Sequence, residues 1–450
     1  MDNPRRPGAF GAEVGVEGPG ATSSRIDDAL LLAPPSPWLR PPMVLHRHAF
    51  PRPGSLMDLD LPPEHASFRD GVRELAQAVA LPLAAEVDRD HRFPQEAVGA
   101  AAEAGLLGVL IPRQYGGLGL DALAFALCID ELARACASTS VIVDVHTSVG
   151  SEPILLFGTD EQKRRWLPRL ASGELLGAFA LTEPASGSDA ASLKTSARRN
   201  GDGYVLNGTK IFITNIGRAG LYIVFARTGP DERAAGVSAF LVPADTPGVR
   251  IGQVFKKMGL NGSPTGELVL EDVVLPAANR LAAEGQGFAV AMRALDSGRI
   301  GISGQALGIA QAAVDEATNL MKGRARERGS PHPAGSLREV ADLPTWWGGQ
   351  GDDFTLADMA TRLESARLLA YNAAWLCSAG RPFTRQASMA KLHCTDTAMQ
   401  LALDALQLAG EEGTFSGSPF ERHVRDAKAL QIYEGSNQVQ RIVIAREVIQ

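Results

Sequence analysis

Apolar residues in the first third of this 450-residue chain recur with the period of amphipathic helices. One helical face is indicated by four residues at spacings of four, three and four: Phe68, Val72, Leu75 and Val79. A second helix is expected from Pro94 to Ala104, because proline is tolerated in a first helical turn. Further helical patterns cover residues 122–136 and 161–170. The N-terminal region is therefore predicted to be all-helical.

Between about residues 176 and 288 the apolar pattern changes to that of short strands. Four runs rich in β-branched and aromatic residues predict strands: 203–206, 210–214, 221–225 and 238–242. Turn signals separate these runs, among them 200–203, Asn207-Gly208 and Thr246-Pro247-Gly248. Short strands at this spacing are typical of an antiparallel sandwich or barrel and not of a parallel sheet.

After Gly287 the helical pattern returns. Helices are expected in three long alanine- and leucine-rich segments and in two shorter ones: 288–322, 354–378, 383–408, after Pro419 and after Ser436. A stretch rich in proline, glycine and tryptophan interrupts them from about residue 325 to 353. A loop this long inside a compact domain is usually functional or disordered.

These patterns predict an α+β multidomain protein. We expect an N-terminal α-helical domain over residues 57–176, a middle antiparallel β domain over 177–288, and a C-terminal helical bundle over 289–450 that contains the inserted loop. Residues 1–56 are rich in proline, lack sustained periodicity and are expected to be a disordered extension. Acidic residues within them argue against an organelle transit peptide, and we expect the native chain to start at Met57.

Composition and charge exclude several classes of function. Hydrophobic residues make up 45% of the chain and charged residues 21%, an ordinary globular balance. A net charge of −7 disfavours binding to nucleic acid, which needs a basic surface. No run of 18 apolar residues predicts a membrane span. The four cysteines form no CxxC pair, so we expect neither disulfides nor a metal site, and a cytoplasmic location.

Two glycine-rich segments resemble nucleotide-binding motifs but lack the required context. Residues 117–122 match GxGxxA, yet Pro112-Arg113-Gln114-Tyr115 intervenes after the apolar run that ends at Ile111, and no second strand follows, so a tight turn is favoured. Residues 203–210 have the spacing of a phosphate-binding loop, but they end in Thr209-Lys210 where lysine must come first. We interpret them as part of a hairpin.

Two other segments carry the candidate chemistry. Glu434 stands in a predicted loop and is followed directly by Gly435, which lets main chain approach a substrate closely. Alone, Glu434 would be an ordinary loop carboxylate. Upstream, residues 181–189 read Leu-Thr-Glu-Pro-Ala-Ser-Gly-Ser-Asp. Together the two segments resemble the acyl-CoA dehydrogenase family of flavoenzymes, and the resemblance runs from about Met57 to the last residue, with the same order of domains.

The resemblance implies FAD as the cofactor, since no protein side chain accepts a hydride. Residues 179–188 resemble the loop that lays main chain and the Thr182 hydroxyl along the flavin edge. Residues 212–214 resemble the second flavin-contacting strand, with Phe212 where a tryptophan is common. The positions that match the family's cofactor contacts are Phe179, Leu181, Thr182, Gly187, Ser188, Phe212, Ile213, Thr214, Arg324, Gln407, Gly410, Ser436 and Gln438.

Four positions match the family's substrate contacts: Ser188, Asp296, Arg299 and Gly435. Taken singly, Asp296 and Arg299 fit an i,i+3 surface pair. Their place in the family pattern instead favours contact with the CoA arm.

The reaction implied by the resemblance is α,β-dehydrogenation of a short- or medium-chain acyl-CoA to the trans-2-enoyl-CoA. Glu434 would remove the α-proton while flavin N5 takes the β-hydrogen as hydride. A free glutamate has a pKa of about 4.3, too low for such a base, so burial would have to raise it. Some family members carry the base just before the arginine of the Asp296–Arg299 segment. That position is Gly298 here, which leaves Glu434 as the expected base.

The family shares FAD between subunits, so a homodimer or homotetramer is expected, with an electron-transfer flavoprotein as electron acceptor. This chain departs from the pattern at two cofactor contacts. Arg324 is followed by Ala-Arg-Glu-Arg in place of a Gln-Phe-Gly-like turn, and Glu411-Glu412 replaces a glycine and its neighbour. The two glutamates would oppose a diphosphate unless they point to solvent.

The segments 137–142 and 146–148 look most like those of short-chain enzymes. Ser140 stands where a glutaryl-specific relative carries an arginine, so a dicarboxylate substrate is disfavoured. His146 is expected to be a packed helix histidine. Two alternatives stay open: an acyl-CoA oxidase or acyl-carrier-protein dehydrogenase with the same fold, and a scaffold that has lost FAD, which the Glu411-Glu412 change motivates.

Overall fold

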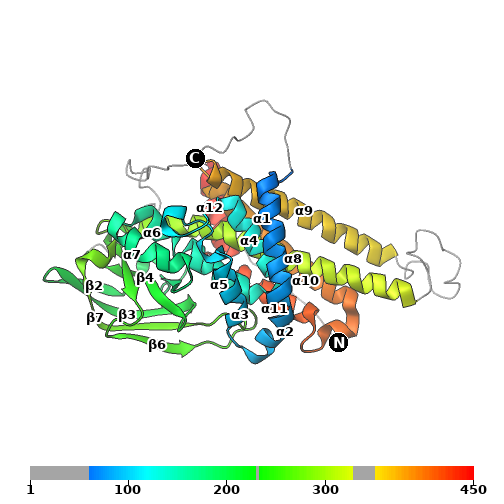
Figure 1. Ribbon diagram of the computed structural model, residues 1–450, viewed down its shortest axis with the longest axis horizontal. Coiled ribbons are helices and arrows are strands. Elements are labelled where there is room, and N and C mark those ends of the chain that lie inside the picture. The colour runs from blue at the N-terminus through cyan, green and yellow to red at the C-terminus, as the bar shows by residue number, and fades with distance from the viewer. Residues whose placement is uncertain (1–59, 230–232, 328–349, 450) are drawn as a thin grey trace, which may run out of the picture. The chain divides into compact units, whose positions relative to one another are not determined.

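The computed structural model describes residues 60–229, 233–327 and 350–449, all within one compact unit (Figure 1). The predicted extension over residues 1–56 and residues 328–349 of the predicted loop lie outside the described residues. The loop is shorter at both ends than the sequence indicated, because residues 325–327 and 350–353 belong to helices.

The N-terminal region is helical, as its periodicity predicts. Its helices are α1 (Pro63–Leu75), α2 (Leu81–Asp90), α3 (Gln95–Glu103), α4 (Ala122–Ala135), α5 (Ala137–Ser148), α6 (Glu152–Phe157) and α7 (Asp160–Ala171). Side chains fix two helix starts: Asp121 accepts from the N–H of Ala124, and Thr159 and Gln162 form a capping box. Every residue of α5 is buried, so this helix lies in the interior.

The middle region is a mostly antiparallel sheet, which confirms the expected β domain. Its strands are β1 (Leu176–Ala180), β2 (Ser196–Asn200), β3 (Gly203–Thr214), β4 (Ala219–Arg227), β5 (Val237–Pro243), β6 (Val249–Val254), β7 (Thr265–Pro276) and β8 (Arg280–Leu281). The strand order is β6-β7-β3-β2-β4-β5-β8, and β1 pairs with β4 in parallel.

One predicted turn is wrong. Asn207 and Gly208 lie inside the single strand β3, where the register against β7 shifts between Leu206 and Gly208. A Cβ atom at Gly208 would lie 2.4 Å from the Thr195 hydroxyl oxygen, so glycine permits a close approach there and no reversal. The hairpin turn lies earlier, between β2 and β3, where Asn200 pairs with Gly203.

The C-terminal region is the expected helical bundle. It contains α8 (Gly287–Glu327), α9 (Gln350–Ser378), α10 (Thr384–Ala409), α11 (Pro419–Leu430) and α12 (Asn437–Ile449). Helices α8, α9 and α10 lie side by side (Figure 1). Helix α8 also packs against α4 and α5, and one apolar cluster joins α5 with the four helices α8 to α11. The N-terminal helices and the bundle therefore share a core.

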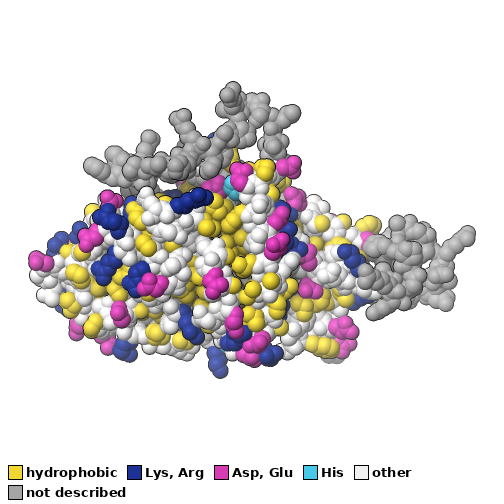
Figure 2. Space-filling model, in the orientation of Figure 1, with side chains coloured by type: hydrophobic (Ala, Val, Ile, Leu, Met, Phe, Trp, Pro, Cys, Tyr) yellow, Lys and Arg dark blue, Asp and Glu magenta, His cyan; other side chains and the backbone are white. Residues whose placement is uncertain are grey.

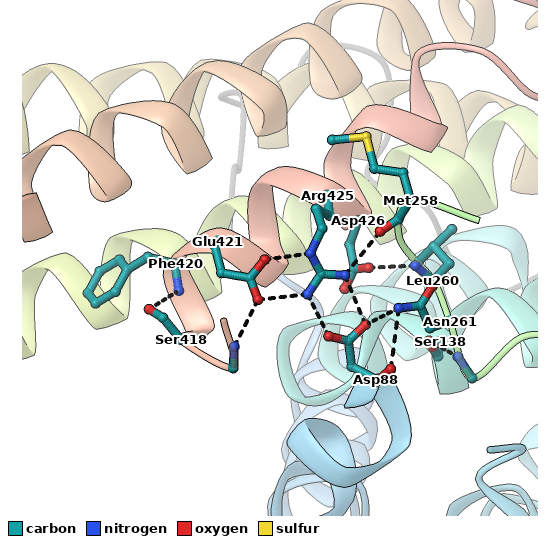
Figure 3. A network of polar contacts seen from close by, with 12 residues as sticks. Asp88, Ser138, Met258, Leu260, Asn261, Ser418, Phe420, Glu421, Arg425 and Asp426 are labelled. Carbon is teal, nitrogen blue, oxygen red and sulfur yellow. Dashed lines mark hydrogen bonds and ion pairs between the residues drawn. The ribbon is translucent and has the colours of Figure 1, made fainter. Parts of the chain in front are cut away.

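A polar network ties all three regions together (Figure 3). Arg425 of α11 pairs with Asp88 at the end of α2 and donates to the Met258 carbonyl in the loop after β6. The adjacent Asp426 accepts from the Leu260 N–H at 2.6 Å. Because α11 leads directly into the loop that carries Glu434, the network fixes that loop's starting point relative to the sheet.

The surface agrees with the modest net charge. Acidic and basic side chains are intermixed across the face in Figure 2. Within the described ranges, no helix combines the length and apolar character needed to cross a membrane.

Candidate active site

Glu434 lies in a strained turn between α11 and α12. Its backbone φ is +51°, and that of Gly435 is +90°. A left-handed conformation costs a residue other than glycine about 1 to 2 kcal/mol, so surrounding contacts must hold it. Hydrogen bonds to the main chain hold this turn: Asn437 N–H donates to the Gln431 carbonyl at 3.0 Å, and both Lys391 and the Gln440 side chain donate to the Gly435 carbonyl at 2.9 Å.

The Glu434 carboxylate is buried and unpartnered. Both of its oxygens are shielded from solvent, and neither accepts a hydrogen bond from the described residues. Burial raises the pKa of Glu434 to about 7, although the nearby charges of Lys391 and Arg299 oppose the rise. A carboxylate with this pKa and two vacant oxygens can act as a general base near neutral pH.

Helix α8 meets the carboxylate at a glycine. A Cβ atom built on Gly298 would lie 2.1 Å from Glu434 Oε2, closer than any real contact allows. Residue 298, the other position that the resemblance offered for the base, thus adjoins the Glu434 carboxylate. A side chain at residue 298 and the Glu434 side chain compete for the same space.

Asp296 and Arg299 form an ion pair of 2.6 Å, but it is not the surface pair that their spacing alone suggested. Arg299 is only 5% exposed. It also donates to Ser388 at 3.3 Å, and Asp296 accepts from the Thr384 hydroxyl at 2.7 Å. The pair therefore fixes a buried cation near Glu434.

Lys391 of α10 is a site residue that the sequence analysis missed. Its ammonium is buried and donates to the Gly435 carbonyl and to Asn437 Oδ1, both at 2.9 Å. Burial lowers its pKa to about 7, against the opposing effect of the Glu434 charge. The available signal was a single lysine inside an apolar helical run, which is hard to separate from a solvated surface lysine.

The two segments assigned to the flavin edge lie together. The Ile211 N–H donates to the Thr182 carbonyl at 2.9 Å, which sets the loop after β1 against the end of β3. Lys210 reinforces the contact by donating to the Leu181 carbonyl at 3.1 Å and to Glu183 at 2.7 Å. Glu183 also accepts from the backbone of residues 194 and 195, so a buried ion pair shapes the loop.

Lys210→Met is expected to destabilise this loop. The substitution leaves the Glu183 carboxylate without its cation in a buried position, and such a loss costs about 3 to 5 kcal/mol. Chemical denaturation should report this loss in the free energy of unfolding, together with weaker retention of FAD. Lys194→Met is the matched control, because Lys194 is exposed and contacts Glu183 only through its backbone. Equal stability of the two variants would contradict the assigned role.

The flavin-edge segments leave suitable groups available. Within the described part of the chain, the hydroxyls of Thr182, Ser188 and Thr214 hydrogen-bond to no protein group. Phe212 is 63% exposed at a φ of +58°, with its ring 5.4 Å from that of Phe255. Vacant hydroxyls on these segments, together with an exposed aromatic ring, fit a planar, polar-edged ring system such as a flavin.

The flavin-edge and Glu434 groups are linked through the core. Phe179 of β1 packs against the apolar cluster that also contacts Tyr433, the residue before Glu434. Ile213 and Leu181 are buried at the same end of the sheet. Phe179 therefore adjoins the same apolar cluster as the residue that precedes the predicted base.

Helix α5 is anchored to this end of the sheet. His146 Nδ1 accepts from the Gly177 N–H at 3.0 Å, and Asn215 donates to the carbonyls of Ile142 and Gly177. Burial lowers the pKa of His146 to about 4, so its ring is neutral at physiological pH. The expectation of a packed histidine is confirmed.

Three of the remaining predicted cofactor contacts form a second group. Arg324 donates to the carbonyls of Leu408 and Ala409 at 2.9 and 3.2 Å, at the end of α10. Gln407 and Gly410 are exposed beside it. Among the described residues, no hydrogen bond or ion pair links these three side chains to Glu434.

Glu411 and Glu412 are exposed, in agreement with the alternative that they point to solvent. Ser436 and Gln438 lie at the start of α12, where Ser436 Oγ accepts from the Val439 N–H at 3.4 Å and Gln438 is exposed. Their contacts with FAD stay predictions, as do those of Gly187, which is exposed with open space around it.

Comparison with known proteins agrees with this arrangement. Three family models match: acyl-CoA dehydrogenase N-terminal domain over residues 62–174, middle domain over 178–273, and C-terminal domain over 285–340 and 349–449. An acyl-CoA dehydrogenase of Bacillus subtilis is 46% identical over 386 residues, covering 86% of this chain and 98% of that protein. The mitochondrial short-chain specific acyl-CoA dehydrogenase of Bos taurus is 43% identical over 391 residues, 87% of this chain and 91% of that protein.

Among solved structures, butyryl-CoA dehydrogenase from Megasphaera elsdenii matches with a TM-score of 0.80 at 38% identity, covering 88% of this chain and all of that one. The sequence identity to these relatives and the share of the chain that they cover establish the family. The chain belongs to the acyl-CoA dehydrogenase family of FAD-dependent oxidoreductases.

Proposed function

We propose that Glu434 is the base with which this FAD-dependent acyl-CoA dehydrogenase removes the α-proton of a short- or medium-chain acyl-CoA, giving the trans-2-enoyl-CoA. The observation that carries the proposal is the buried Glu434 carboxylate, which has two vacant oxygens and a pKa raised to about 7. Nothing in the fold requires an unpaired buried carboxylate at this position. A substrate that brings an acidic C–H bond gives it a partner.

Bound FAD supplies the acceptor for the β-hydrogen. The residues proposed to hold it at the sheet are those around Thr182, Ser188 and Thr214, whose hydroxyls are vacant. Removal of the α-proton leaves negative charge on the thioester oxygen, which needs hydrogen-bond donors. The Glu434 N–H has no partner among the described residues and is the proposed protein donor.

The rate of substrate-dependent flavin reduction should rise with pH through about 7 and then level off. The deprotonated form of Glu434 is the active base, and its pKa is raised to about 7, so protonation below that value removes activity. Stopped-flow absorbance with an acyl-CoA, at pH values on both sides of 7, measures this. Reduction by dithionite in the same buffers is the control for flavin access. A substrate-dependent rate that is flat or falls as pH rises would contradict the assignment.

We further propose short-chain specificity and transfer of electrons to an electron-transfer flavoprotein. Ser140 supports a non-dicarboxylate substrate, because its hydroxyl is buried and donates to the Ile129 carbonyl, with no cation at that position. Family resemblance supports the flavoprotein acceptor and a homodimer or homotetramer that shares FAD near Arg324. The four cysteines, none of them in a CxxC pair, support a cytoplasmic location. Reoxidation of the reduced enzyme by an electron-transfer flavoprotein, and not by oxygen, separates a dehydrogenase from an oxidase.

A further inference from the structure

A second buried carboxylate lies beside Glu434. Asp144 of α5 is 0% exposed, and a Cβ atom built on Gly301 of α8 would lie 2.0 Å from Asp144 Oδ1. Gly298, which faces Glu434 in the same way, stands three residues earlier on α8. Residues at i and i+3 share a helix face and lie roughly 5 to 6 Å apart, so the two carboxylates occupy neighbouring gaps along one face.

Asp144 has no structural partner that accounts for its burial. Its Oδ1 accepts from the Ser148 hydroxyl at 3.1 Å, whereas Oδ2 is buried and accepts nothing from the described residues. The titratable groups that face it are Glu434, Cys128 of α4 and Tyr433, and none of them is a cation. An unsatisfied buried carboxyl oxygen costs free energy, so Asp144 is poorly explained as a packing residue.

The chemical state of Asp144 limits what it can bind. Burial and the neighbouring Glu434 charge raise the pKa of Asp144 well above its usual value, which favours its protonated, neutral form. A protonated carboxyl offers one donor and vacant acceptor capacity. Its complement is a neutral group that both donates and accepts, namely a hydroxyl.

We propose that Asp144 is a specificity residue that hydrogen-bonds a hydroxyl group on the γ or δ carbon of the acyl chain, so that the enzyme prefers a hydroxylated short-chain acyl-CoA to the plain acyl-CoA. The proposal rests on the proposed function of Glu434. The α-carbon must lie at Glu434, so a group one helical turn along α8 meets the acyl chain a few carbons further on. A plain alkyl chain would cover Asp144 and leave its Oδ2 unpaired.

The test compares 4-hydroxybutyryl-CoA with butyryl-CoA as substrates of the FAD-loaded enzyme. Their kcat/KM values should differ by roughly tenfold or more in favour of the hydroxylated thioester, because a buried polar group left unpaired penalises the analogue that lacks the hydroxyl. Asp144→Val should abolish or reverse this preference. Asp144→Asn keeps a donor and an acceptor at the same place and should retain most of it.

Two further variants test whether a changed substrate preference comes from Asp144 itself and not from misfolding or from the loss of any buried carboxylate. Gly301→Ala adds a methyl group that would lie 2.0 Å from Asp144 Oδ1 and 3.0 Å from the Phe125 ring, and it should also reduce the preference. Glu152→Gln is the matched control, since Glu152 is another buried carboxylate with an unpartnered oxygen, bonded to Ser297, and its change should leave the substrate ratio unaltered.

Each outcome decides the proposal. A wild-type enzyme that prefers butyryl-CoA overturns it without any variant, and so does an Asp144→Val enzyme with the wild-type ratio. If butyryl-CoA reduces the flavin at least as fast as 4-hydroxybutyryl-CoA does, the proposed function stands while the role of Asp144 falls. If neither thioester reduces a flavin that dithionite does reduce, both fall.

Discussion

Replacing Glu434 with glutamine is expected to leave a yellow, folded protein whose flavin no acyl-CoA reduces at a significant rate. Glutamine keeps the shape of the side chain but cannot take a proton from carbon. Loss of a positioned general base lowers the rate by roughly 10²- to 10⁴-fold. Rapid mixing of the FAD-loaded variant with butyryl-CoA, followed by flavin absorbance, measures the loss directly.

Two controls make this result specific to the base. FAD content and reduction by dithionite should match the wild type, since Glu434 does not belong to the predicted flavin-edge segments. Glu412→Gln removes an exposed glutamate from the same region of sequence. The flavin of this variant should be reduced by acyl-CoA at the wild-type rate. Normal bleaching of the Glu434→Gln enzyme by substrate would eliminate Glu434 from the mechanism.

Local sequence patterns predicted most of the helices of this fold, because the apolar residues on the buried face of an amphipathic helix recur every three or four positions. The three long helices of the bundle were recognised in this way, within a few residues of α8, α9 and α10. Strands β1, β2, β6, β7 and β8 were not predicted from the sequence. Strand β6 is an edge strand that is half-exposed on both faces, so it carries no clear alternation.

The misplaced turn at Asn207-Gly208 has a similar cause. Asn-Gly is a strong hairpin signal when only neighbours in sequence are considered. In the fold, β2 and β7 flank β3 on both sides, and pairing with both keeps β3 extended through the dipeptide. Thr195 fills the space that a side chain at Gly208 would need. Tertiary pairing therefore outweighed the local preference.

Within the site, the family motif located Glu434. Not every ionisable residue beside the Glu434 carboxylate was recognised from the sequence. Lys391 and Asp144 come from helices far from Glu434 in sequence, and each has an ordinary neighbourhood in its own helix. Their importance comes from burial beside an unpaired carboxylate, which is a property of the packed molecule. The same holds for Asp296 and Arg299, whose spacing indicated a surface pair and whose burial only the fold reveals.

Gly298→Ala is expected to separate catalysis from stability. The added methyl group would overlap Glu434 Oε2, because a Cβ atom at residue 298 would lie only 2.1 Å from that oxygen. The obstructing atom is the far end of a side chain, so the carboxylate can swing aside with little cost to folding. A displacement of about 1 Å in a reacting group can lower the rate roughly 10²-fold. We therefore expect a near-normal midpoint of chemical denaturation with a flavin-reduction rate about 10²-fold lower.

Gly323→Ala is the matched control for this prediction. Gly323 lies on the same helix α8, and a Cβ atom there meets nothing within 4 Å. Its substitution should raise stability slightly, as alanine does for glycine in helices, and leave flavin reduction at the wild-type rate. If the flavin of the Gly298→Ala enzyme is also reduced by substrate at the wild-type rate, the Glu434 carboxylate does not act from the position it occupies beside α8. If both alanine variants lose activity, the effect belongs to α8 as a whole and not to the space reserved for the base.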